Sequence, residues 1–182
     1  MSNQHKVYVS YHPEDEFYWR HFKDLFSETY GVIVSDSIRM RDFRMGDFDD
    51  IALSTGKMRR YIRDNYLQDT TVTVVLIGAN TWQQESVDWE INASLHQTEF
   101  YTRSGLLGIL IPTYITPWDK CYIPTIPLRL YDNVVCGYSK IYPWYDEPDV
   151  LLSWIRYAHL RRIEVQPINS RLPLRNNLSD KR

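Results

Sequence analysis

The sequence lacks the motifs that mark the commonest nucleotide-binding and hydrolytic sites. It contains no G-x-x-x-x-G-K-[ST] and no G-x-G-x-x-G, so neither a P-loop nor the standard dinucleotide fingerprint is present. It also contains no G-x-S-x-G, the turn that carries the nucleophile of α/β hydrolases. These three enzyme classes are therefore not indicated.

Cysteine and paired histidines are scarce as well. Only two cysteines occur, Cys121 and Cys136, which indicates reduced thiols rather than a disulfide framework. The five histidines are scattered, with no H-x-x-x-H pair, and no Cys-x-x-Cys is present. Closely spaced ligands of this kind are what zinc sites need, so we predict no metal site.

Long apolar runs and a strong charge of one sign are also missing. No run approaches the roughly 18 apolar residues that a membrane span needs, and the N-terminus has no apolar targeting core. The formal net charge is −2 and the sequence pI is about 6.2, so no long-range attraction to a phosphate backbone is indicated. We expect a cytoplasmic protein whose partners include neither nucleic acid nor a membrane.

The residues that are present predict one α/β domain. Apolar and β-branched segments at 6–10, 32–35, 72–77, 106–111 and near 133–136 predict strands, and helical spacing predicts helices at 13–30, 57–66, 87–98 and 149–162. The segments 72–77 and 106–111 are apolar throughout, which is typical of strands in a parallel sheet with both faces covered. We expect a three-layer domain over 1–163, followed by a flexible C-terminal tail over 164–182, which contains two prolines and many polar residues.

Residues 71–91 combine a buried strand, a polar loop and a helix that carries Glu90. If Ser86 is the N-cap, Glu90 lies in the first turn, where the helix dipole favours an ionised carboxylate. Glu90 is about 100° around the helix from Ile91, so we expect it to flank the buried stripe at the carboxyl edge of the sheet, where such sheets bind ligands. An anion there suits stabilisation of an oxocarbenium-like cation. Acids are also common in first turns for the dipole alone, and this second interpretation stays open.

Two segments resemble the TIR-like domain of the Thoeris antiphage defence system. They are DIALSTGKMRRYIRDNYLQDTTVTVVLIGANTWQQESVDWEI and the opening KVYVSYHPEDE. The order of these blocks, with V-L-I-G followed by W-E-I, carries the resemblance over residues 5–111. It implies a flavodoxin-like, TIR-like three-layer fold with a central parallel sheet.

The resemblance also implies an activity and a set of site residues. In TIR enzymes this helix supplies the glutamate that is needed to break the nicotinamide–ribose bond of NAD, a role that maps onto Glu90. The residues that map onto the substrate pocket are Ser10, Tyr11, Asp36, Asn80 and Trp82. NAD is then a substrate, and no cofactor is implied. Thoeris TIR-like proteins make a cyclic ADP-ribose isomer that activates a separate effector, and assembly into a homo-oligomer often completes a TIR pocket.

Several alternatives stay open at this point. The competing function is a non-catalytic TIR-like scaffold or nucleotide-sensing module that acts by oligomerisation. Tyr11 is as well suited to covering the sheet edge as to stacking on a base. For Trp82 the alternative to a pocket role is to anchor its loop, and for Asp36 it is to cap a turn. The segment 37–50, with Phe43 and Phe48, predicts a long loop that is a candidate lid over the pocket.

Overall fold

The computed structural model describes residues 4–27, 31–35, 55–114 and 125–174. Five strands form one parallel sheet in the order β2-β1-β3-β4-β5. The strands are β1 (His5–Ser10), β2 (Val32–Val34), β3 (Val72–Ile77), β4 (Gly105–Leu110) and β5 (Ile141–Pro143). This strand order is flavodoxin-like, so the predicted fold class is confirmed.

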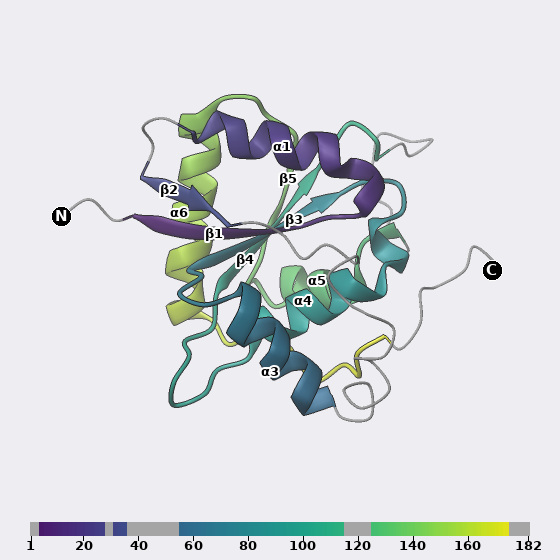
Figure 1. The fold of residues 1–182 in the computed structure, drawn as a ribbon, viewed down its shortest axis with the longest axis vertical. Helices are drawn as coiled ribbons and strands as arrows, with labels where there is room; N and C mark the ends of the chain where they lie inside the picture. Colours follow the sequence, from purple (N-terminus) through teal and green to yellow (C-terminus); the bar gives the residue numbers. More distant parts are fainter. Residues whose placement is uncertain (1–3, 28–30, 36–54, 115–124, 175–182) are drawn as a thin grey trace.

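Helices cover both faces of the sheet. One face packs against α1 (Glu16–Leu25) and α6 (Pro148–Glu164), through a core that includes Phe22, Val74 and Ile155. The other face packs against α3 (Thr55–Tyr66), α4 (Glu85–Leu95) and α5 (Leu128–Val135), which lie together on one side of the strands in Figure 1. Val72–Ile77 is buried at every residue, as expected of a central strand between two helical layers.

The predicted strand near 133–136 is wrong. Those residues belong to the end of α5, and the fifth strand lies further along, at Ile141–Pro143. A short apolar run does not distinguish a strand from a helix, and here Leu130 packs inward while the Asn133 side chain donates to the Arg129 carbonyl within the helix. The segment between β4 and α6 therefore supplies both a helix and an edge strand.

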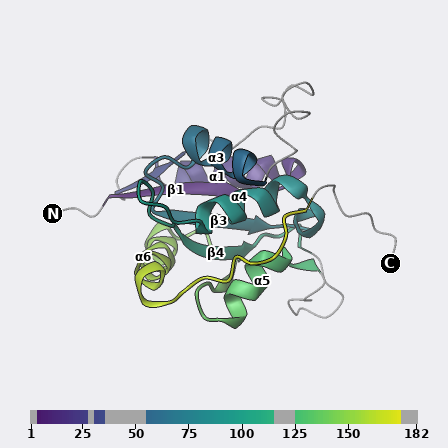
Figure 2. The same ribbon diagram turned by 90° about the horizontal axis from the view of Figure 1, so that it is seen from below.

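The segment after α6 also differs from the expected loose tail. Residues 165–174 run beside α5 and α4 (Figure 2). Ile168 and Asn133 are joined by two backbone–side-chain hydrogen bonds, of 2.8 and 3.0 Å. We call residues 165–174 the C-terminal strap. Asp36 and the candidate lid, 37–50, lie outside the described residues. In the part of the chain that the structure describes, no helix is both long and apolar enough to cross a membrane.

Two glycines of β4 give a test of how tightly the sheet is packed. A Cβ atom on Gly105 would overlap the backbone carbonyl of Ala158 in α6, whereas one on Gly108 would meet the ends of the Ile77 and Leu130 side chains, which can rotate. We predict that Gly105→Ala lowers the free energy of unfolding by about 1–3 kcal/mol, as overpacking does. Gly108→Ala should cost clearly less.

Thermal and urea denaturation of the two variants check this prediction. At this chain length a loss of about 1 kcal/mol lowers the melting temperature by roughly 2–4 °C. Equal melting temperatures for the two variants would show that α6 adjusts its position against β4 and that the contact is not rigid.

Candidate functional site

The carboxyl ends of β1 and β3 form the topological switch point of the sheet. The chain leaves β1 towards β2 on one side, and β3 lies on the other side of β1, so a crevice opens outside the ends of these two strands. The loops around this edge are tied together. The Asn80 side chain donates to the Glu14 carboxylate at 3.0 Å, and the Thr113 hydroxyl donates to Asp15 at 2.7 Å.

Asp15 is the buried centre of this edge on the α1 side. Burial raises the pKa of its carboxyl, and the hydrogen bond from Thr113 opposes that shift. A Cβ atom on Gly78, directly after β3, would overlap both the Asp15 carboxylate and the Thr113 hydroxyl, so a larger residue there would displace these two side chains. Three loops therefore meet at this carboxylate, which holds the rim of the crevice in place.

Helix α4 enters the interior more deeply than its sequence predicts. It begins at Glu85, with Gln84 and not Ser86 as the N-cap, and every residue from 87 to 95 is buried. Val87, Ile91 and Leu95 pack inward. Glu90 is then the sixth helical residue, beyond the first turn, where the helix dipole has fallen off. The dipole argument for an ionised Glu90 is therefore wrong.

Glu90 lies against the end of β1. The side chains of Tyr8 and Ser10 approach its carboxyl and act to lower its pKa, although the Ser10 hydroxyl makes no hydrogen bond of good geometry. Burial outweighs both groups, because Glu90 is only 4% exposed, and it raises the pKa to about 8. At neutral pH the carboxyl of the unliganded protein is mostly protonated. The structure thus brings Glu90 and Ser10 together, in a form that is a weak acid rather than a fixed anion.

The other predicted pocket residues are spread around the same edge. Tyr11 stacks on Trp19 of α1, with ring centroids 5.7 Å apart, and packs with the core on the α1 face, whereas Glu90 lies on the α4 face. Asn80 precedes the short 3-10 helix η3 (Thr81–Gln83), and its side chain donates to Glu14, while Trp82 is half-buried on η3. Asn80 and Trp82 therefore line the loop between β3 and α4, and Tyr11 covers the opposite face of the sheet.

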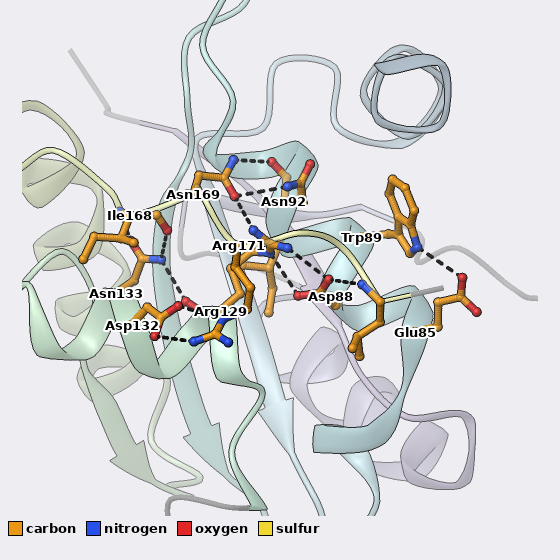
Figure 3. A network of polar contacts seen from close by, with 12 residues as sticks. Glu85, Asp88, Trp89, Asn92, Arg129, Asp132, Asn133, Ile168, Asn169 and Arg171 are labelled. Carbon is orange, nitrogen blue, oxygen red and sulfur yellow. Dashed lines mark hydrogen bonds and ion pairs between the residues drawn. The ribbon is translucent and has the colours of Figure 1, made fainter. Parts of the chain in front are cut away.

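The side of α4 opposite Glu90 is held by a buried ion pair. Asp88 accepts two hydrogen bonds from the Arg129 guanidinium, at 2.9 and 3.1 Å, and Arg129 is fully buried (Figure 3). Asp88 also accepts from the backbone N–H of Leu174 at 2.9 Å. A bidentate pair of this kind fixes the orientation of both partners, so α4, α5 and the C-terminal strap are joined at one carboxylate.

Asn169 of the strap completes this network. Its side-chain oxygen accepts from Arg129 at 2.9 Å and from Asn92 at 3.2 Å, and its amide donates to the Asn92 carbonyl at 3.0 Å (Figure 3). Asp88 and Asn92 are four residues apart and share one face of α4. Glu90 lies between them in sequence and points to the other side of the helix. The strap therefore holds α4 from the side opposite Glu90.

The sequence interpretation missed two kinds of residue: one that lies next to Glu90, and those that hold α4 in place. Tyr8 shares a face of β1 with Ser10, and strand alternation alone was enough to place it beside the site. Asp88 lies in the first turn of α4, and its partner Arg129 is 41 residues away, so no local pattern joins them. Among the described residues, no group of three or more His, Cys, Asp or Glu side chains is arranged to hold a metal ion.

Comparison with known proteins identifies a family. The family model described as the TIR-like domain of the Thoeris protein ThsB matches residues 8–114. This range begins within β1 and contains β2, β3 and β4, together with α4 and Glu90. No curated protein matches the chain.

The raised pKa of Glu90 predicts a pH-dependent stability. Between about pH 4.5 and 8 the folded protein keeps the proton of Glu90 while the unfolded chain releases it. The resulting contribution to the free energy of unfolding is fully present below pH 4.5 and is lost as pH rises through 8, by at most about 1.4 kcal/mol per pH unit. Glu90→Gln removes this dependence, so its stability relative to wild type should increase across the window.

Urea unfolding of both proteins at pH 5, 6.5 and 8.5 checks this. Taking the difference between them cancels titrations common to both, such as that of His159, whose pKa is lowered to about 4 mainly by burial. A constant difference between Glu90→Gln and wild type would show that Glu90 is already ionised near its ordinary pKa.

The ion pair on α4 makes a second prediction. Arg129→Met leaves the Asp88 carboxylate buried without its cation, and we expect it to lower the free energy of unfolding by about 3–5 kcal/mol. Arg171→Ala removes a bidentate ion pair with Asp132 at the surface, and it should cost less than about 1 kcal/mol. Chemical denaturation measures both, and similar losses for the two variants would contradict the central role given to Asp88 and Arg129.

Proposed function

The chain belongs to the TIR-like domain family of the Thoeris protein ThsB, and on this basis we propose that it cleaves NAD at the nicotinamide–ribose bond and makes a cyclic ADP-ribose isomer. The family gives the protein a role in Thoeris antiphage defence. In the proposed function the product is a signal that diffuses to a separate effector. The observation that carries the proposal is the position of Glu90 beside Ser10, at the carboxyl end of β1 and next to the switch point of the sheet.

The surroundings of Glu90 suggest how it would act. The nicotinamide ring of NAD carries a positive charge, and a cation close to a carboxyl group lowers the pKa of that group. Substrate bound beside Glu90 would therefore lower the pKa of its carboxyl. The carboxyl would then release its proton to solvent, and the anion would be present when the bond to nicotinamide breaks. As the bond to nicotinamide breaks, positive charge moves to the ribose, and a carboxylate in a site shielded from water stabilises that charge strongly.

The product depends on which nucleophile reaches the ribosyl cation first. Water gives linear ADP-ribose, whereas a hydroxyl or ring nitrogen from the other end of the same nucleotide gives a cyclic isomer. A well-positioned internal group has an effective molarity of up to about 10⁵ M or more, which favours cyclisation where water is excluded. Half-buried Trp82, on the loop between β3 and α4, is suited to shielding this position.

The competing function is a TIR-like scaffold or nucleotide sensor without catalysis. In that case Glu90 would be a structural residue, held protonated between Tyr8 and Ser10. The two functions predict different outcomes for one substitution, because Glu90→Gln preserves the shape and the neutral state of the side chain but cannot form the anion.

The test measures nicotinamide release from NAD by the wild-type protein, alone and with lysate of infected cells. We predict that Glu90→Gln lowers the rate by roughly 10²–10³ while the protein stays folded. The matched control is Glu164→Gln, at the exposed end of α6, which should keep the wild-type rate. Near wild-type turnover by Glu90→Gln would exclude the assigned role, and no release by the wild type under either condition would favour the scaffold.

Chromatography of the same reactions against linear ADP-ribose tests the product. We expect a cyclic isomer as the main product of the wild type, and a shift towards the linear form in Trp82→Ala. If the active wild type makes only linear ADP-ribose, the protein is an NAD hydrolase and the cyclase proposal is wrong.

A further inference from the structure

A large cavity lies between α3 and the end of α4, away from the switch point of the sheet. Its volume is about 1010 Å³, at the upper end of the range of small-molecule sites. Neither Glu90 nor Ser10 lines it. The residues that form its walls are Gly56, Lys57, Arg59, Arg60, Arg63, Asp64, Ala93, His96, Thr98, Glu99, Phe100 and Tyr101.

The walls of this cavity carry an excess of positive charge. Of the lining residues that the structure describes, four are cationic and two are acidic, in a chain whose formal net charge is −2. Arg59, Arg60 and Arg63 follow each other at helical spacing and so share one side of α3. One of the two acids, Asp64, already accepts a hydrogen bond from the Tyr101 hydroxyl at 2.9 Å. The cavity therefore suits an anion.

Arg63 makes the cavity a preformed one. Its guanidinium donates to the Ala93 carbonyl at 3.1 Å and to the Thr102 carbonyl, so it joins α3 to the end of α4 and to the segment that follows. Arg63 also lies over the ring of Tyr101, 5.4 Å from its centroid. The two walls are thus fixed relative to one another before any ligand binds, which lowers the entropy cost of binding.

The guanidinium groups of Arg59 and Arg60 are available to bind a ligand. Within the described residues, neither guanidinium forms a hydrogen bond or an ion pair, although Arg59 is half-buried. Burial and the nearby charge of Arg129 lower the pKa of Arg59, and burial with Arg59 and Arg63 lowers that of His96. These side chains therefore lie close to other positive charges. At the rim, Phe100 is 86% exposed, which is unusual for so large an apolar side chain.

We propose that this cavity binds a phosphorylated nucleotide, with Arg59 and Arg60 on the phosphate oxygens and Phe100 against the base. The planar guanidinium group matches phosphate oxygens in bidentate geometry. An aromatic ring beside a basic groove is the combination with which proteins stack bases while holding their phosphates. The site is independent of the proposed NAD cleavage, since it shares no residue with the carboxyl edge.

Isothermal titration of the full chain with ADP, inorganic pyrophosphate and adenosine tests the proposal. Neither ADP nor pyrophosphate contains a nicotinamide bond, so failure of NAD cleavage does not affect the result. We expect saturable binding of ADP and of pyrophosphate, with adenosine at least about tenfold weaker than ADP. Arg59→Gln/Arg60→Gln should weaken ADP binding roughly tenfold or more, as loss of charge-assisted hydrogen bonds does.

Two further variants separate the parts of the site. Phe100→Ala should weaken ADP binding but leave pyrophosphate unchanged, and Arg156→Gln, exposed on α6 across the sheet, should change neither by more than about twofold. If the double variant does not fold, Arg60→Gln alone, at an exposed position, gives the same comparison.

Two results would overturn the proposal. The first is the absence of saturable binding of both ADP and pyrophosphate at millimolar concentration. The second is ADP binding that survives Arg59→Gln/Arg60→Gln but is lost in Trp82→Ala, because it would place the nucleotide at the carboxyl edge of the sheet.

Discussion

The enclosure of α4 on all sides is the constraint on which the rest of the site depends. Any polar side chain that this helix carries into the interior must find a partner there or lose its charge. Asp88 and Glu90 are two residues apart and meet these conditions on opposite sides of the helix. Asp88 faces α5 and has the Arg129 guanidinium. Glu90 faces β1, where, among the described residues, it meets Tyr8 and Ser10 but no cation, and its pKa rises to about 8. One helix therefore carries a paired carboxylate that fixes its position and an unpaired carboxyl that is free to change its protonation state.

The fold is the part that the sequence predicts well. The apolar run 72–77 needs two covered faces, so it indicates a parallel sheet whatever its neighbours are. Glu90 is expected at the carboxyl edge because it follows a recognisable strand and loop, whereas Ser10 enters only through the resemblance to TIR-like domains. The charge state of Glu90 was not predictable in the same way. It depends on how deeply α4 is buried, and the burial of Asp88 and Asn92 comes from α5 and the C-terminal strap, which lie far along the chain.

In two regions, 133–136 and the C-terminal strap, the structure differs from the prediction for the same physical reason. Both are polar or short apolar segments whose structure is set by distant partners. Asn133 and Asn169 would each suit a surface loop, and their local sequence gives no sign that they bind each other's segments and the buried Arg129. Burial of apolar side chains leaves a periodic pattern in the sequence of a helix or strand, whereas a network of amide and guanidinium hydrogen bonds leaves no such pattern. Polar networks inside a domain are for this reason the features that a single sequence hides best.

The strap also bears on how the site would respond to a ligand. It holds α4 from the side opposite Glu90, and Arg63 holds the C-terminal end of the same helix through the Ala93 carbonyl. The two attachments use hydrogen bonds to backbone groups and to a buried ion pair, which are sensitive to direction and distance. A movement of α3 or of the strap would reach Glu90 through α4 as a rigid element, without passing through the sheet. α3 and the C-terminal strap together therefore determine how the Glu90 carboxyl lies against β1. They thereby also determine how deeply it is buried, and this burial is what raises its pKa.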